Sequence, residues 1–127
     1  MELVIIVVVL ALIEYVVFGM LVGRARGQYD CPAPATTGHP VFERYNRVQQ
    51  NTGEQLIVFV PIMLLYGYLG NPNVAAGLGM FFVIGRIVYL KSYVDDPGKR
   101  TVGFLMGFAP VAIMLIATLI NAVGGLL

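Results

Sequence analysis

Apolar segments alternate with short polar ones along the 127-residue chain. Apolar runs cover residues 3–23, 74–94 and 102–127, and the second half of a further segment, 40–69, is equally apolar. A helix of about 20 apolar residues crosses a hydrocarbon core of about 30 Å, so each segment predicts a membrane-spanning helix. The chain is therefore expected to be an all-α, integral membrane four-helix bundle, with residues 1–127 forming one transmembrane domain.

The segment 40–69 differs from the other three because its first half is polar. Pro40 suits the first position of a helix, where its missing N–H is no loss. A helix over all of 40–69 exceeds the length that a bilayer needs, so its polar half is expected near the headgroups or shielded by protein. Between the helices, loops are expected at 24–40 and 95–100, and a tight Gly-Asn-Pro-Asn turn at 70–73.

The positive charges gather beside the first and third loops. The basic residues there are Arg24, Arg26, Arg44, Arg47, Lys91, Lys99 and Arg100, whereas the 70–73 turn and both chain ends carry no Lys or Arg. Loops rich in Lys and Arg remain on the cytoplasmic side of a membrane. This distribution predicts that loops one and three are cytoplasmic and that both termini lie on the opposite side.

The composition strengthens the membrane assignment and removes several function classes. Apolar residues make up 58% of the chain and charged residues 12%, against about 45–50% and about 25% in typical globular proteins. A single cysteine and a single histidine exclude a disulfide framework and a Cys- or His-rich metal site. A net charge of +1 gives no basic footprint for nucleic acid. We therefore expect neither a metal nor a nucleic-acid partner.

Polar side chains nevertheless continue into the predicted spans. On a helix over 40–69, one third of the circumference carries Glu43, Arg47, Gln50, Asn51 and Glu54. The span 74–94 carries Arg86, Tyr89 and Tyr93 on one face. Arg44 is equally well explained by snorkelling to headgroups, but Arg86 would lie roughly 12 Å deep by helix rise. Ionisable groups at such depth are costly and mark functional sites, here one suited to carboxylates, amides and an ammonium group.

Two ionisable residues are expected at similar depth on different spans. Glu14 lies about nine residues from the loop-one end of its span, and Arg86 about eight residues from the matching end of its own. Buried charges are tolerable when paired. We therefore expect Glu14 and Arg86 to contact each other, within or between subunits, as structural buried charges. The alternative is a protonated Glu14 packed at a helix interface.

The polar segments resemble those of a known family. The loop Pro34-Ala35-Thr36-Thr37-Gly38, the run Phe42-Glu43-Arg44 and the pattern Arg47-x-Gln49-x-Asn51-x-x-Glu54 resemble the MAPEG family, the membrane-associated proteins in eicosanoid and glutathione metabolism. The similarity is greatest to the branch of microsomal glutathione transferases and leukotriene C synthase. It covers nearly the whole chain and is specific at 34–54 and 86–100. Gln55 departs from the synthase, which has a tyrosine there, and Gly27 replaces a second arginine.

The resemblance implies an activity and assigns residues to it. Arg100 matches the arginine that faces the glutathione sulfur, which makes it the implied catalytic residue. Positions that hold glutathione in the family match Arg26, Arg47, Gln49, Asn51, Glu54, Tyr89 and Tyr93. The implied co-substrate is glutathione, whose thiolate attacks a hydrophobic small-molecule electrophile, or a lipid hydroperoxide, dissolved in the membrane lipid. The implied assembly is a homotrimer with its sites between subunits.

Two other functions remain open from the sequence. A non-catalytic lipid-binding scaffold of the same family would need no thiolate activation, whereas Arg100, Asn51 and Glu54 together favour an enzyme. A small channel or transporter subunit would line an axis with ionisable residues, and Glu14 is the only candidate for such an axis. Binding and turnover of glutathione would distinguish the three.

Overall fold

The computed structural model describes residues 1–127 and contains four long helices. They are α1 (Glu2–Gln28), α2 (Pro40–Leu69), α3 (Pro72–Asp95) and α4 (Thr101–Leu126), with a short 3-10 turn, η1 (Pro97–Lys99), before α4. All four are long and apolar enough to cross a membrane. The prediction of an all-α, integral membrane four-helix bundle is therefore confirmed.

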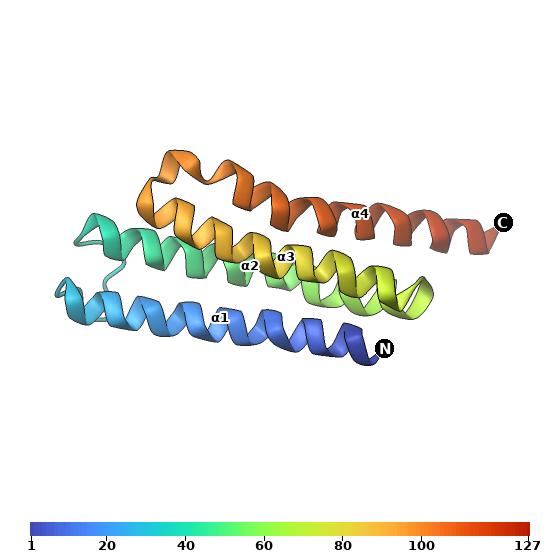
Figure 1. Cartoon of the computed structure of the whole chain (residues 1–127), viewed down its shortest axis with the longest axis horizontal. Helices are drawn as coiled ribbons and strands as arrows, with labels where there is room; N and C mark the ends of the chain where they lie inside the picture. Colours follow the sequence, from blue (N-terminus) through green and yellow to red (C-terminus); the bar gives the residue numbers. More distant parts are fainter.

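The four helices lie side by side, and helices that follow each other in the chain are antiparallel (Figure 1). The α1–α2 loop and η1 lie at one end of the bundle, which we call the loop end. Both chain ends and the α2–α3 turn lie at the other, which we call the terminal end. All of the clustered Lys and Arg residues therefore lie toward one end of the bundle, as expected from their places in the sequence.

Proline and polar caps define where the helices begin. Pro40 is the first residue of α2, and the preceding His39 accepts a hydrogen bond at Nδ1 from the Val41 backbone N–H at 3.2 Å. At the start of α3, Asn71 accepts through Oδ1 from the backbone N–H groups of the second and third residues of that helix, at 2.9 and 3.4 Å. These side chains satisfy donors that a helix leaves free in its first turn.

Two boundaries differ from the sequence predictions. The loop expected at 24–40 is shorter, because α1 continues to Gln28 and has Tyr29 as its C-cap residue. Residues 24–28 include Arg, Ala and Gln, which are good helix formers, so the helix extends past its apolar run. The turn expected at 70–73 is also shorter, because Pro72 already opens α3.

The apolar core fills the terminal end of the bundle. Its fully buried side chains include Phe59, Met63, Phe82 and Met114. The rings of Phe59 and Phe82 stack with their centroids 3.9 Å apart and join α2 to α3. Close van der Waals packing of this kind drives helix association in lipid, where apolar burial alone gives no preference.

Glycines bring α3 and α4 into close contact. A Cβ on Gly85 would lie 2.7 Å from the Cβ of Met106 and 2.8 Å from the backbone N of Gly107. A Cβ on Gly103 would collide with the backbone of Tyr89. Small residues permit this backbone approach between membrane helices. The approach sets α4 beside the face of α3 that carries Arg86, Tyr89 and Tyr93.

Candidate functional site

A polar cavity lies between α2, α3 and the beginning of α4, toward the loop end. Its volume is about 390 Å³, and its lining residues are Arg47, Asn51, Tyr89, Tyr93, Arg100 and Phe104. We call it the inner cavity. Five of its six lining residues are site residues expected from the sequence. Two guanidinium groups, two phenols and an amide face this space with no carboxylate among them, which suits an anionic or hydrogen-bond-accepting ligand.

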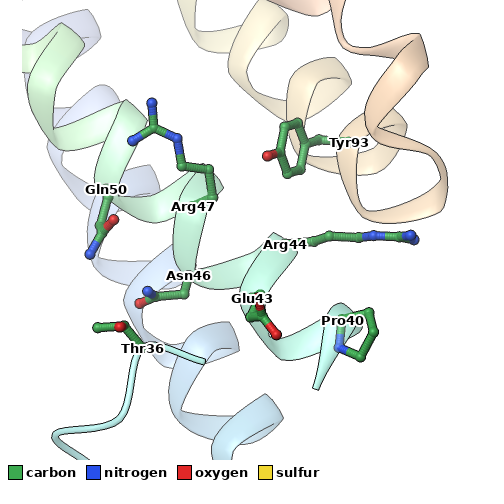
Figure 2. Close-up of a pocket in the computed structure, with 8 residues that line it drawn as sticks. All are labelled: Thr36, Pro40, Glu43, Arg44, Asn46, Arg47, Gln50 and Tyr93. Carbon is green, nitrogen blue, oxygen red and sulfur yellow. The ribbon is translucent and has the colours of Figure 1, made fainter. Parts of the chain in front are cut away.

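A second cavity lies closer to the loop end than the first, against the start of α2. Its volume is about 520 Å³, and it is lined by Thr36, Pro40, Glu43, Arg44, Asn46, Arg47, Gln50 and Tyr93. We call it the loop cavity. Figure 2 shows Tyr93 of α3 facing Arg47 of α2, and these two residues line both cavities. Together the cavities offer adjoining polar space from the α1–α2 loop into the bundle.

Arg47 and Glu54 form an ion pair two helical turns apart on α2. The distance between Arg47 Nη1 and Glu54 Oε1 is 3.5 Å, and the side chains are 49% and 59% exposed. An exposed pair of this kind contributes little to stability. The pair can therefore open at small cost, which would free a guanidinium and a carboxylate for the polar groups of a ligand.

Aromatic contacts fix the tyrosines of the inner cavity. The guanidinium carbon of Arg86 lies 4.2 Å from the centre of the Tyr89 ring. Tyr89 in turn lies against Tyr93 and Phe104, with ring centroids 5.5 and 6.5 Å apart. These contacts hold Tyr89 in the cavity wall, because a cation over the ring face and tilted ring pairs are both favourable.

Arg86 is fully buried and its hydrogen bonds go to α2. Its Nη2 donates to Asn51 Oδ1 at 2.7 Å and to Thr52 Oγ1 at 2.9 Å, and its Nε donates to Thr52 Oγ1 at 3.2 Å. The Thr52 hydroxyl donates to the Val48 carbonyl at 2.8 Å. The expected burial of Arg86 is confirmed.

Within the protomer, Arg86 and Glu14 form no ion pair or hydrogen bond, and their expected contact between subunits stays a prediction. Glu14 is also buried, on the bundle-facing side of α1, but neither of its carboxyl oxygens has a hydrogen-bond partner. No ion pair joins the two residues, because Arg86 is engaged by polar groups on α2. The direction of each side chain depends on helix rotation as well as on depth, and the Arg86 guanidinium is turned to Asn51 and Thr52 of α2.

Three expected site residues line neither cavity: Arg26, Gln49 and Glu54, of which Glu54 is the ion-pair partner of Arg47. Arg26 donates through Nη1 to the backbone carbonyls of Cys31 at 3.1 Å and Ala35 at 2.7 Å, and its guanidinium stacks over Phe42. Gln49 lies against α1, with its Nε2 3.4 Å from the position of a Cβ on Gly19. Within one protomer Arg26 therefore holds the α1–α2 loop, and Gln49 contributes to the α1–α2 contact.

The sequence reasoning missed two residues of this region. Thr52 is wholly buried and accepts two hydrogen bonds from Arg86, and Phe104 lines the inner cavity. Thr52 lies at helical spacing between the buried Val48 and Leu56. A hydroxyl in an otherwise apolar row of a spanning helix is a signal for a buried hydrogen bond, because lipid offers it no partner. No comparable signal distinguishes Phe104 from the other aromatic residues.

Comparison with known families agrees with this geometry. The model of the MAPEG family matches residues 4–120. The chain belongs to the MAPEG family. The match extends over all four helices, so it covers the inner cavity as well as the apolar core. The resemblance expected from residues 34–54 and 86–100 is therefore confirmed.

Individual relatives support the same branch. An uncharacterized protein from Synechocystis sp. is 42% identical over 112 residues, which cover 88% of this chain and 82% of that protein. Microsomal glutathione S-transferase 2 from Homo sapiens is 36% identical over 107 residues, covering 84% of this chain and 71% of the relative. Leukotriene C4 synthase from Bos taurus is 30% identical over 83 residues, covering 65% and 55%. Members of both named groups within the MAPEG branch are thus similar to this chain.

Proposed function

We propose that this MAPEG protein is a membrane-bound glutathione transferase, which activates the glutathione thiolate for attack on lipophilic electrophiles. The observation that carries the proposal is the inner cavity, where Arg47, Asn51, Tyr89, Tyr93 and Arg100 converge. The similarity to a microsomal glutathione S-transferase and to a leukotriene synthase supports glutathione as the co-substrate. A cavity lined by guanidinium, amide and phenol groups matches a peptide with two carboxylates and an ionisable thiol.

Arg100 is the proposed thiolate activator. One of its Nη atoms donates to the Pro97 carbonyl at 3.0 Å, which orients the guanidinium and leaves other N–H groups free. A thiol with a pKa near 8.5 is mostly protonated at neutral pH, and a neighbouring cation lowers that pKa by stabilising the thiolate. Arginine suits this role because it stays charged at any working pH. The sulfur then forms a bond to an electrophilic carbon, whose leaving group departs with the bonding electrons.

The remaining site residues are proposed to bind the peptide. Arg47 is suited to a glutathione carboxylate through charge-assisted hydrogen bonds. Glu54, beside it, is suited to the peptide ammonium group. We further propose reduction of lipid hydroperoxides as a side activity. The thiolate attacks the outer oxygen of the hydroperoxide, the O–O bond breaks, and the lipid leaves as an alcohol after taking a proton. The sulfenic acid that forms on glutathione then reacts with a second glutathione to give the disulfide and water.

The proposed assembly is a homotrimer with each site completed by a neighbour. Arg26 and Gln49 lie outside the inner cavity of their own protomer, so a neighbouring subunit is the means by which they would reach a ligand. Exposed polar groups on α2 support the same proposal. Glu54 is 59% exposed on a spanning helix, and contact with lipid would be costly there. A second copy packed on α2 would shield it.

The proposed orientation places the loop end, with both cavities, in the cytoplasm, where glutathione is abundant and loops rich in Lys and Arg remain. Cys31 is only 3% exposed, so a labelling test needs a new cysteine. Thr37, in the α1–α2 loop, is exposed. Thr37→Cys in a Cys31→Ala background should resist a membrane-impermeant maleimide in intact cells and react after permeabilisation. Labelling in intact cells would show that the loop end lies outside the cytoplasm and that the proposed orientation is wrong.

The decisive experiment measures thiolate formation and turnover in the purified protein. Bound glutathione should show ultraviolet thiolate absorbance at neutral pH, and a panel of lipophilic acceptors should be conjugated. Glutathione binding without either signal would favour the non-catalytic lipid-binding scaffold. Absence of glutathione binding at millimolar concentration would overturn the proposal.

A further inference from the structure

The hydrogen bonds around Arg86 fix the orientation of each partner. A guanidinium group only donates, so every atom that faces it must accept. Thr52 accepts twice through Oγ1 and therefore directs its own hydroxyl hydrogen to the Val48 carbonyl, at 2.8 Å. Asn51 accepts through Oδ1 at 2.7 Å. A side-chain amide has one accepting end, so with its oxygen on Arg86 the Asn51 NH₂ group faces elsewhere.

Asn51 is the member of this network that reaches the inner cavity. It lines the cavity with Arg47, Tyr89, Tyr93 and Arg100, although it is only 8% exposed. Arg86 itself is 1% exposed and does not line the cavity. The contact of Arg86 with a ligand is therefore indirect. It acts through Asn51 and through the Tyr89 ring, which its guanidinium carbon overlies at 4.2 Å.

We propose that Arg86 is a positioning residue, which holds the Asn51 oxygen and thereby turns the Asn51 NH₂ group into the inner cavity. The wall next to Asn51 then offers donors, and the group bound there is an acceptor or an anion, a thiolate or a carboxylate. Reversal of the Asn51 amide would place N–H groups against the guanidinium and a carbonyl oxygen against the anion. Both contacts are unfavourable in a buried site.

This inference rests on the proposed function only for the identity of the ligand, glutathione. The contribution of the Arg86 hydrogen bonds to the free energy of unfolding can be measured without any ligand. Arg86 is a buried cation that forms no ion pair with a carboxylate in its protomer, so its direct contacts are with the two neutral acceptors and the Tyr89 ring. Loss of either acceptor leaves donors of a buried cation unsatisfied, which destabilises the fold. Stability and ligand binding thus give two separate measurements of the same contact.

The first comparison sets Arg86→Gln against Thr52→Val in the full-length protein in detergent. Both break the buried network and lower the unfolding temperature. Arg86→Gln also frees the Asn51 amide to rotate, and the dissociation constant for glutathione should rise about tenfold or more, as for the loss of one hydrogen bond to a charged group. Thr52→Val keeps the Arg86–Asn51 bond and should bind close to wild type. Equal weakening of binding in both variants would overturn the positioning role.

The second comparison uses Asn51→Asp, which keeps an oxygen for Arg86 and replaces the NH₂ group with a second oxygen. Without ligand its unfolding temperature should equal or exceed that of the wild type, whereas Asn51→Leu should lower it. Glutathione binding by Asn51→Asp should nevertheless weaken about tenfold or more, because the donors are lost. Wild-type binding by Asn51→Asp would overturn the inference, and so would a fall in its unfolding temperature as large as that of Asn51→Leu.

The two proposals fail in different ways in these experiments. A wild-type protein that does not bind glutathione overturns the proposed function, but the unfolding temperatures of Asn51→Asp and Asn51→Leu still decide the Arg86–Asn51 contact. A wild-type protein that binds and ionises glutathione supports the function. The comparison of Arg86→Gln with Thr52→Val then decides whether Arg86 positions Asn51 or only stabilises the fold.

Discussion

The loop end and the terminal end of the bundle differ in the side chains that they bury. At the terminal end, side chains such as Phe59, Met63 and Phe82 are fully buried and make only apolar contacts. At the loop end, the same helices bury Arg86 with Asn51 and Thr52 and leave polar cavities beside them. One end is filled, and the other holds space for a ligand.

The difference indicates that one end of each helix serves mainly stability and the other end mainly ligand binding. Apolar packing is what holds membrane helices together, so the terminal end is expected to supply most of the stability. Polar groups inside a membrane are expensive, so their number at the loop end is explained by a use, which we propose to be glutathione binding. Substitutions at the two ends should therefore have separable effects on stability and on activity.

The largest expected effect is on stability, from Phe59→Ala at the terminal end. Loss of a fully buried ring stacked at 3.9 Å on Phe82 should lower the free energy of unfolding by about 3 kcal/mol. Glutathione binding by the folded protein should change little. Val58→Ala, at a neighbouring lipid-facing position, is the control and should be nearly neutral. A loss of glutathione binding in folded Phe59→Ala would show that the two ends are coupled.

The next effect is on chemistry, from Arg100→Leu at the loop end. Removal of the activating cation should raise the pKa of bound glutathione by about two units, or 2.7 kcal/mol, and abolish the thiolate absorbance at neutral pH. The unfolding temperature should stay near that of the wild type, because Arg100 is exposed. Lys99→Leu is the matched control, since Lys99 pairs with Asp95 at 3.8 Å and does not line the inner cavity. Retained absorbance in Arg100→Leu would favour a mechanism centred on Tyr93.

Arg47→Leu should act on binding and not on ionisation. The lost charge-assisted hydrogen bonds to a ligand carboxylate should weaken glutathione binding by about 2 kcal/mol. At saturating glutathione the thiolate absorbance should return. Arg24→Leu removes an arginine that lines neither cavity and should bind as the wild type does. A titration of glutathione followed by thiolate absorbance separates the two effects, and absorbance that stays low at saturation would assign Arg47 to activation instead.

The polar face of the site could be predicted because helical periodicity is enough to define it. Arg47 and Asn51 are four residues apart on α2, and Tyr89 and Tyr93 are four apart on α3, so each pair shares a face in any straight helix. The first residue of α2 was equally predictable, because Pro40 allows few other positions. These features depend on local geometry alone.

The partners of the buried charges depend on how the helices are rotated against one another, which periodicity does not determine. Depth suggested Glu14 for Arg86, whereas the contact is with Asn51 and Thr52. The direction of Arg26 depends on the path of the α1–α2 loop, whose carbonyls it binds. Side chains that cross between elements were thus the part that the sequence alone could not place.

Glu14 gives the smallest effect and the sharpest test of the comparison between the two ends. It lies between the apolar core and the polar network, and both of its oxygens are buried without a hydrogen-bond partner. A polar group in that state is destabilising, so Glu14→Met, which keeps the length of the side chain, should raise the free energy of unfolding by about 1 kcal/mol. Glu2→Met, at the fully exposed start of α1, is the control and should be neutral. Thermal unfolding in detergent measures both. A loss of stability in Glu14→Met would mean that the Glu14 carboxylate is stabilised in the assembled protein, either by the charge of Arg86 or by a group from a neighbouring subunit of the proposed trimer.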